Sequence, residues 1–315
     1  MIKYERTWLG ALTLGVWALV YATVAKADDF KGTWTIRPAD EAGKIYFGVA
    51  HRRHGGNSQH ESDWPTSAFQ GLDLATRARH DVTFNVARDA GRLDCEGFLK
   101  EGEGAGIFTF TANPTFVKDM AALGFSGIDD EKQFSMALFD VSLEFARQMK
   151  AERLTDLDTN KLIAFRVHGV SQQYIRDLRA EGLTATDSDR LIAFRVHAVK
   201  PDLVRAIRDS GLQASEDQLI AMRVHGVTPE WIAKMKKNGY ENLNVDKFIA
   251  FRVHGVSPEF IEKVEALGYS HPDPEQLVAM RIHGVTPEFI SSMKSKGMKD
   301  LTIDKLVNLR IHGIN

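Results

Sequence analysis

Residues 162–170 read Leu-Ile-Ala-Phe-Arg-Val-His-Gly-Val, and five similar segments follow along the chain. The later copies begin at Leu191, Leu219, Phe248, Leu277 and Leu306. Their histidines follow one another at steps of 29, 28, 29, 29 and 29 residues. A fixed period in this range is the signature of a solenoid, in which each repeat buries its apolar face on its neighbours. The sequence therefore predicts a repeat array.

Weaker copies continue the period toward the N-terminus. One step before His168 lies Phe139, and another step back lies Phe110, which is soon followed by Asn113. These early repeats keep the apolar positions but lack the arginine and the histidine, as expected where the first repeat has no upstream neighbour. We predict an array over residues 113–315, with degenerate repeats at 113–157 and clear repeats at 158–315.

Each clear repeat has the capping residues of two short helices. Asn244 can cap a helix that ends at Gly255, and Ser257 followed by Pro258 can begin a second helix that ends at Gly268. The run between the first cap and the first glycine also alternates as a strand does, so a strand-plus-helix solenoid is the alternative. We favour an α-solenoid of helical hairpins with a period of ~29 residues, because the capping residues precede the run.

Residues 1–27 have the three regions of a secretory signal peptide. Lys3 and Arg6 precede an uncharged run at 8–24, and Ala25-Lys26-Ala27 forms a small-residue cleavage site. Cleavage after Ala27 would give a periplasmic or secreted protein without a membrane span, and an uncleaved N-terminal anchor is the alternative. The whole chain has 40 basic and 42 acidic side chains, which gives no electrostatic footprint for nucleic acid.

Residues 28–112 differ in pattern from the array. Segments at 44–49, 81–86 and 106–110 alternate and are rich in β-branched and aromatic residues, which predicts a small antiparallel β domain. The overall fold class is therefore α+β. The single cysteine, Cys95, shares the apolar side of such a strand with Leu93, so we predict a buried and unreactive thiol.

One polar segment within this domain could hold a metal ion. It contains His51, His54, His60, Glu61 and Asp63. Imidazoles and carboxylates are ligands for divalent transition metals, but Arg52 and Arg53 would repel a cation, and we favour a solvated loop. We expect no cofactor and no catalytic residues, since the sequence has no His-Glu-x-x-His motif, glycine-rich phosphate loop or nucleophile elbow.

The repeats carry two recurring polar positions that we interpret as structural ladders. The arginines are Arg166, Arg195, Arg223, Arg252, Arg281 and Arg310, and the histidines are His168, His197, His225, His254, His283 and His312. On a helix the arginines fall beside the apolar positions, so we expect them to be buried and paired with recurring carboxylates such as Asp246 and Glu259. The histidines lie near helix ends, where an imidazole can bond the last free carbonyls.

The second helix of each repeat varies most in its charged residues. Constant apolar and variable charged positions are typical of a scaffold with an adaptable surface. The candidate partner-binding residues are Arg176, Arg179, Arg205, Arg208, Lys234, Lys237, Lys263 and Lys294.

The segments 251–260, Phe-Arg-Val-His-Gly-Val-Ser-Pro-Glu-Phe, and 280–289, Met-Arg-Ile-His-Gly-Val-Thr-Pro-Glu-Phe, resemble repeats of bacterial envelope proteins. These include the tails of membrane zinc metallopeptidases of the beta-lactam-sensor type. The resemblance covers roughly residues 110–315, and the peptidase part is absent, so it implies a sensory or interaction module without proteolysis. We predict a non-enzymatic exported scaffold that binds a protein. The alternatives are a metal-binding or hydrolytic protein that uses His51, His54 and His60, and a structural envelope spacer.

Overall fold

The structure is a computed structural model, and it describes residues 30–53, 56–184 and 186–314. The described residues divide into two compact bodies. Of the described residues, the sheet body contains those from 30 to 67 together with 71–84 and 94–111, and the array body contains 68–70, 85–93 and those from 112 onward. The predicted signal peptide and His54 lie outside the described residues.

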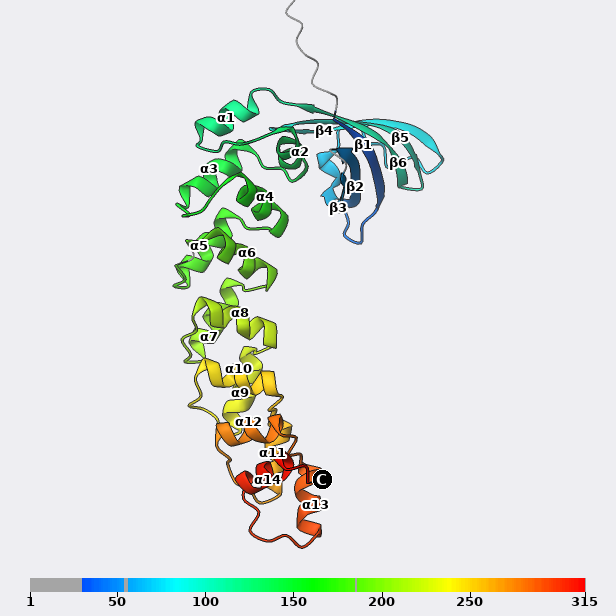
Figure 1. The fold of residues 1–315 in the computed structure, drawn as a ribbon. Coiled ribbons are helices and arrows are strands. Elements are labelled where there is room, and N and C mark those ends of the chain that lie inside the picture. The colour runs from blue at the N-terminus through cyan, green and yellow to red at the C-terminus, as the bar shows by residue number, and fades with distance from the viewer. Residues whose placement is uncertain (1–29, 54–55, 185, 315) are drawn as a thin grey trace, which may run out of the picture. The chain divides into compact units, whose positions relative to one another are not determined.

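Six antiparallel strands precede the helices, as the sequence predicts (Figure 1). They are β1 (Phe30–Pro38), β2 (Lys44–Arg53), β3 (Gly56–Pro65), β4 (His80–Arg88), β5 (Gly91–Lys100) and β6 (Glu103–Ala112), with a short 3-10 helix η1 (Thr66–Ala68) after β3. Their order in the sheet is β3-β2-β1-β6-β5-β4, so the first and last strands pair at its centre.

Aromatic side chains fill the core of the sheet body. The Trp34 ring packs edge-on against Phe84 at a centroid distance of 5.0 Å, and Phe47 packs in the same way against Trp64 at 5.4 Å. Trp34 Nε1 donates to the Glu96 carbonyl over 3.1 Å. Position 97 must be glycine because a Cβ there would lie 2.6 Å from Cζ2 of Trp34 and 2.3 Å from the Ala105 carbonyl oxygen.

Fourteen helices follow in the described chain, and they form the repeat region (Figure 1). Their bounds are α1 (Phe116–Ala122), α2 (Asp130–Leu138), α3 (Leu143–Ala151), α4 (Thr159–His168), α5 (Gln172–Ala180), α6 (Ser188–Val196), α7 (Pro201–Asp209), α8 (Glu216–His225), α9 (Pro229–Lys237), α10 (Val245–His254), α11 (Pro258–Ala266), α12 (Pro274–Ile282), α13 (Pro287–Ser295) and α14 (Ile303–Ile311). The helical hairpin is therefore confirmed, and the strand-plus-helix alternative is wrong.

The helices stack in two rows, because most of them contact the second helix along the chain. Contacts join α4 with α6, α8 with α10, α10 with α12 and α12 with α14, and likewise α5 with α7, α7 with α9 and α11 with α13. We call α4, α6, α8, α10, α12 and α14 the even helices, and α3, α5, α7, α9, α11 and α13 the odd helices. No helix among the described residues is both long enough and apolar enough to cross a membrane.

The predicted caps form the ends of these helices. The Asn244 side chain accepts the Lys247 amide at 3.0 Å at the start of α10, and Gly255 ends that helix in the left-handed conformation with φ 72°. The Ser257 hydroxyl then accepts the Phe260 amide at 3.2 Å to begin α11. Each cap satisfies backbone groups that a helix end leaves without an intrahelical partner.

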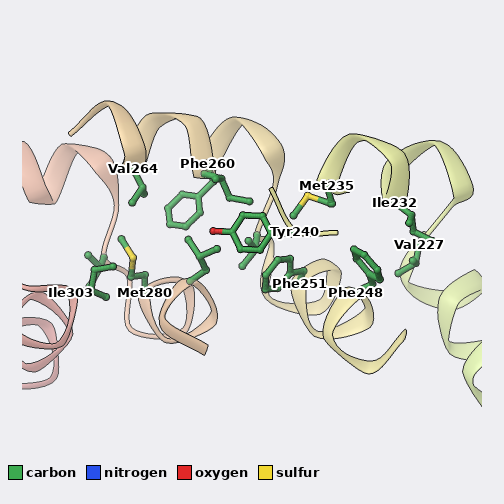
Figure 2. Packing of buried hydrophobic residues seen from close by; sticks show 14 of the residues in the cluster. Val227, Ile232, Met235, Tyr240, Phe248, Phe251, Phe260, Val264, Met280 and Ile303 are labelled. Carbon is green, nitrogen blue, oxygen red and sulfur yellow. The ribbon is translucent and has the colours of Figure 1, made fainter. Parts of the chain in front are cut away.

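The core of the array lies between the two rows (Figure 2). Phe248 and Phe251 of α10 are fully buried and point toward Met235 of α9 and toward Tyr240. The Tyr240 ring packs edge-on against Phe251 at 5.7 Å, and its hydroxyl donates to the Pro272 carbonyl over 2.8 Å. Each repeat thus completes its core with side chains from its neighbours.

Candidate interaction surface

A chain of arginine contacts links successive even helices. Nε of Arg252 in α10 donates to the His225 carbonyl at the end of α8 over 3.3 Å. Arg166, Arg195, Arg223, Arg281 and Arg310 make the same bond to the carbonyls of Phe139, His168, His197, His254 and His283, at 3.0–3.4 Å. The last carbonyls of a helix lack an intrahelical partner, so each repeat supplies a donor to the one before it.

Most of these guanidinium groups also lie over an aromatic ring of the preceding repeat. Arg252 Cζ is 5.2 Å from the centroid of the Trp231 ring. The rings under Arg166, Arg195, Arg281 and Arg310 are those of Phe145, Tyr174, Phe260 and Phe289, at 4.7–5.1 Å. Arg223 differs, because the equivalent position 21 residues before it is Asp202.

These contacts correct two expectations about the arginines. Five of them are exposed and Arg310 is half-buried, so the prediction that they are buried is wrong. The partner that they share is a backbone carbonyl rather than a carboxylate, although Arg166 adds an ion pair with Asp140 at 2.6 Å. A long arginine side chain can cover the ring of the preceding repeat with its stem while its charged group stays in water.

Arg252 and Arg223 provide a matched pair for a stability test. Both donate to a histidine carbonyl, but only Arg252 lies over an aromatic ring in the equivalent position. We expect Arg252→Ala to lower the free energy of unfolding by about 1–2 kcal/mol, and Arg223→Ala by about 1 kcal/mol or less. Denaturant titration followed by circular dichroism measures both changes, and a larger effect at Arg223 would contradict the assignment.

The recurring carboxylates near the N-termini of the even helices have other partners. Lys161 pairs with Asp189, Arg190 with Asp217 and Lys247 with Glu275, while Gln218 Nε2 donates to Asp246 Oδ1 over 2.7 Å. In each case the third residue of one even helix reaches forward to the second residue of the next. The carboxylates therefore do link repeats, but their partners are the third residues of the even helices and not the recurring arginines.

Four of the predicted partner-binding residues are held within the array. Arg176 and Arg179 both bond the Glu152 carboxylate, at 3.0 and 2.6 Å, and the Glu152 side chain is only 5% exposed. One repeat later, Arg205 Nε and Arg208 Nη2 bond the Glu181 carboxylate, each at 2.9 Å. These cations lie beside the ends of α3 and α5, where positive charge also offsets the helix dipole.

The remaining predicted partner-binding residues are lysines of the odd helices. Lys294 donates to the Leu267 carbonyl and lies over the Tyr269 ring. Lys234, Lys237 and Lys263 are exposed. A role for any of the eight residues in partner binding stays a prediction.

The recurring histidines lie at the ends of the even helices. His168, His225, His283 and His312 are exposed, and His197 and His254 are half-buried. Nδ1 of His312 lies 2.8 Å from the Asn308 carbonyl, which is the imidazole contact that the sequence predicts. The contact that recurs from repeat to repeat is the bond that an arginine donates to the backbone carbonyl of the histidine. The imidazole takes no part in that bond.

A line of exposed aliphatic side chains runs along the even helices. Between the arginine and the histidine of each repeat stands a β-branched residue that is about half exposed. This valine line consists of Val167 (48%), Val196 (57%), Val224 (56%), Val253 (50%), Ile282 (55%) and Ile311 (54%). Single exposed apolar residues are ordinary, but a continuous exposed apolar patch marks an interaction site.

The outer surface of the even helices, which we call the even face, extends the valine line. Within α10, Ala250 and Val253 are three residues apart and therefore share one side of the helix. Alanine occupies the same place in five repeats, at Ala164, Ala193, Ala221, Ala250 and Ala279, and each is half-buried. The odd helices differ, since α11 exposes Glu259, Glu262 and Lys263. The even row thus presents a line of exposed aliphatic side chains among charged ones, whereas the exposed residues of α11 are mostly charged.

The structure does not gather the predicted metal ligands that it describes. His51, His60, Glu61 and Asp63 lie on the β2–β3 hairpin, so the expected loop is in fact a pair of strands. His60 pairs with Val49 and Glu61 with Gly48, which puts His60 and Glu61 on opposite faces of the sheet. Glu61 instead binds Arg37 at 2.7 Å, and burial lowers the pKa of His60.

Among the described residues, the acidic group with the spacing of a metal site is Asp156, Asp187 and Asp189. Each has a partner within the chain. Asp156 accepts the Ser188 amide and Asp187 the Arg190 amide, both at 2.8 Å, while Asp189 pairs with Lys161. These bonds explain why the three carboxylates lie close together around the N-terminus of α6.

Cys95 is fully buried in β5, as the sequence predicts. Burial raises the pKa of its thiol to about 12, with a smaller contribution from the nearby Asp94 carboxylate. Since the thiolate is the reactive form, we expect no modification by a thiol reagent at pH 8 in the folded protein and full modification after denaturation. A fast reaction in the native state, measured by absorbance, would contradict the burial of this residue.

Because of the ion pairs between repeats, we expect the stability of the folded array to decrease at acidic pH. Hydrogen bonds from Arg205 lower the pKa of Glu181 and those from Lys247 lower the pKa of Glu275, each below the ordinary 4.5. A carboxyl whose pKa is lowered by folding stabilises the folded state above its unfolded pKa, and this contribution is lost as the pH falls through the folded pKa. We expect the melting temperature to fall below pH 4.5 and Glu181→Gln to flatten that decline. An unchanged slope in the variant would contradict this account.

Compared with known proteins, the chain matches no family model and no curated protein.

Proposed function

We propose that this chain is a non-enzymatic, exported scaffold that binds a protein on the even face of its repeat array. The observation that supports this proposal is the valine line, in which six equivalent side chains stay about half exposed. A solenoid needs apolar residues between its repeats but gains nothing in its own stability from an apolar outer line. Such a surface is typical of repeat proteins that bind a partner along the array.

Differential capture tests the proposal. The tagged chain is incubated with an envelope fraction of the source cell beside a variant in which Val224, Val253 and Ile282 are each replaced by lysine. The matched control replaces Ala233, Ala266 and Ser291, all exposed on the odd helices, with lysine. We expect a protein that the wild type and the control recover and the valine-line variant does not. If all three chains recover the protein equally, the even face is rejected as its binding surface. If none of them recovers a protein, the result favours a structural spacer.

A further inference from the structure

One repeat of the array, whose odd helix is α7, departs from the others at several positions. Its connection to the next even helix, residues 212–214, is one residue shorter than the connections at 183–186, 240–243, 269–272 and 298–301. This difference produces the single step of 28 residues in the series of histidines. The irregular repeat lies within the array body, between α6 and α8.

The turn that ends α6 has a strained backbone. Ala198 adopts the left-handed conformation with φ 54°. In the equivalent turns this place belongs to glycines with φ 69–72°, at Gly169, Gly226, Gly255 and Gly284. A side chain in this conformation brings Cβ close to the following carbonyl oxygen, which costs free energy that glycine does not lose. The turn before α7 is therefore less stable than the turns of its neighbours.

Helix α7 also lacks the side-chain cap of the other odd helices. The residue before it is Lys200, which makes no cap bond to the first turn. In α3, α5, α9, α11 and α13 a hydroxyl accepts an amide of the first turn, and these hydroxyls belong to Ser142, Ser171, Thr228, Ser257 and Thr286. The first amides of a helix have no intrahelical acceptor, so the N-terminus of α7 is held less firmly than those of the other odd helices.

The contacts across this repeat are weaker as well. Counting back from Arg223 leads to Asp202, and counting forward from the start of α7 leads to Leu203, so neither count finds the aromatic ring of the other repeats. In the even row, α6 and α8 come together less closely than the other neighbouring pairs from α4 to α14. The irregular repeat is thus joined to the next one by fewer contacts.

The space around α7 is not completely filled. A pocket of about 410 Å³ lies at its N-terminus, where Tyr174 and Lys200 line it. A second pocket of about 330 Å³ lies at its C-terminus, where Val204 and Leu212 line it. Side chains beside unfilled space lack packing contacts on that side. Helix α7 can therefore shift without breaking a close-packed contact at either pocket.

We propose that the irregular repeat is a hinge, at which the helices up to α6 and those from α8 onward bend relative to each other. Each repeat of a solenoid contacts only its neighbours, so a weak repeat uncouples the segments on its two sides. The turn at 197–200 and the connection at 212–214 are the short segments that absorb the backbone change. The pair Arg190–Asp217 and the bond from Arg223 Nε to the His197 carbonyl, at 3.1 Å, keep the two segments joined.

This inference does not rest on the proposed function, although it bears on the same surface. Val196 of α6 and Val224 of α8 are successive members of the valine line. Bending between these two helices changes the distance between the two side chains and therefore the curvature of the even face. A hinge at this place lets one array fit surfaces of different curvature.

Distances between spin labels measure the bending. The pair Gln173→Cys/Glu230→Cys spans α7, and the control pair Glu230→Cys/Glu288→Cys spans the regular repeat of α11. Each position is the second residue of an odd helix and is exposed, and Cys95 stays unlabelled because it is buried. Double electron–electron resonance on the full chain should give a distance distribution at least about twice as wide for the first pair. Equal widths would overturn the hinge.

Exchange of residues between the two repeats tests the cause. Ala198→Gly/Lys200→Ser/Leu203→Phe restores the turn, the cap and the ring, so it should narrow the distribution across α7 to that of the control pair and slow amide exchange in α7 about tenfold or more. The reverse variant Gly255→Ala/Ser257→Lys/Phe260→Leu should widen the control distribution.

The melting temperatures separate bending from stability. If the restored variant melts at a higher temperature but keeps the wide distribution, the three positions affect stability alone and the hinge proposal fails. If the reverse variant does not fold, the restored variant still decides between the two outcomes. A narrowed distribution in the restored chain, with unchanged distances for the control pair, is the result that supports the hinge.

Discussion

Replacing Phe251 with alanine should lower the free energy of unfolding by about 3–5 kcal/mol, the usual effect of removing a buried phenyl ring. Phe251 is fully buried between the two rows and packs against Tyr240. Because each repeat contacts only its neighbours, the cavity would also weaken the coupling between the helices before and after α10. We therefore expect denaturant unfolding, followed by circular dichroism, to begin earlier and to lose cooperativity.

The neighbouring repeats provide the controls for this prediction. Met222 and Met280 occupy the position of Phe251 in the repeats before and after it, and both are fully buried. Phe251→Met should therefore cost less than about 1.5 kcal/mol. Val253→Ala, two residues further and half exposed, should change stability by about 0.5 kcal/mol or less. Equal losses for Phe251→Ala and Val253→Ala would contradict the assignment of inner and outer positions.

The valine-line variant Val224→Lys/Val253→Lys/Ile282→Lys should weaken binding of the captured partner by about 100-fold or more. Burying the exposed half of each aliphatic side chain contributes about 1 kcal/mol, and three such contributions correspond to roughly that factor. The melting temperature should change little, since the three side chains are already half in water. Titration calorimetry with the purified partner measures the affinity.

The odd-helix variant Ala233→Lys/Ala266→Lys/Ser291→Lys adds the same charge on the other row. It should bind within about threefold of the wild type, because exposed charges away from a contact have small effects. A similar loss of affinity in both variants would mean that positive charge on the array, rather than the loss of the valine line, weakens the complex.

The repeat architecture could be predicted because its signals are local and recur. Asn244, Gly255, Ser257 and Pro258 mark helix ends through backbone requirements that each repeat meets in the same way. The period of the apolar positions then decides which residues are buried. The alternating segments predict the small antiparallel sheet, including residues 44–49 of β2, whereas the segment that contains His51 and Asp63 lies in β2 and β3 and not in the predicted loop, because its polar sequence hides the alternation.

The partners of the charged residues could not be predicted, because they depend on which repeats lie side by side. Arg252 bonds a carbonyl 27 residues earlier, and Glu152 receives arginines 24 and 27 residues later. A residue pattern within one repeat cannot distinguish a carbonyl from a carboxylate as the acceptor. The exposure of Val253 could have been predicted from the helical period. Val253 lies on the side of α10 opposite the buried Phe248 and Phe251, and therefore outside the core.

The most direct test of the even face is the accessibility of a thiol placed on it. Cys95 is buried and its raised pKa keeps it unreactive, so Val253→Cys creates one reactive thiol and Lys263→Cys creates a matched thiol on α11. The rate of maleimide labelling is measured for each variant with and without the captured partner. We expect the partner to slow labelling at position 253 by about tenfold or more and to leave labelling at position 263 unchanged, as for a residue that becomes buried in an interface. Unchanged labelling at position 253 in the complex would contradict this expectation.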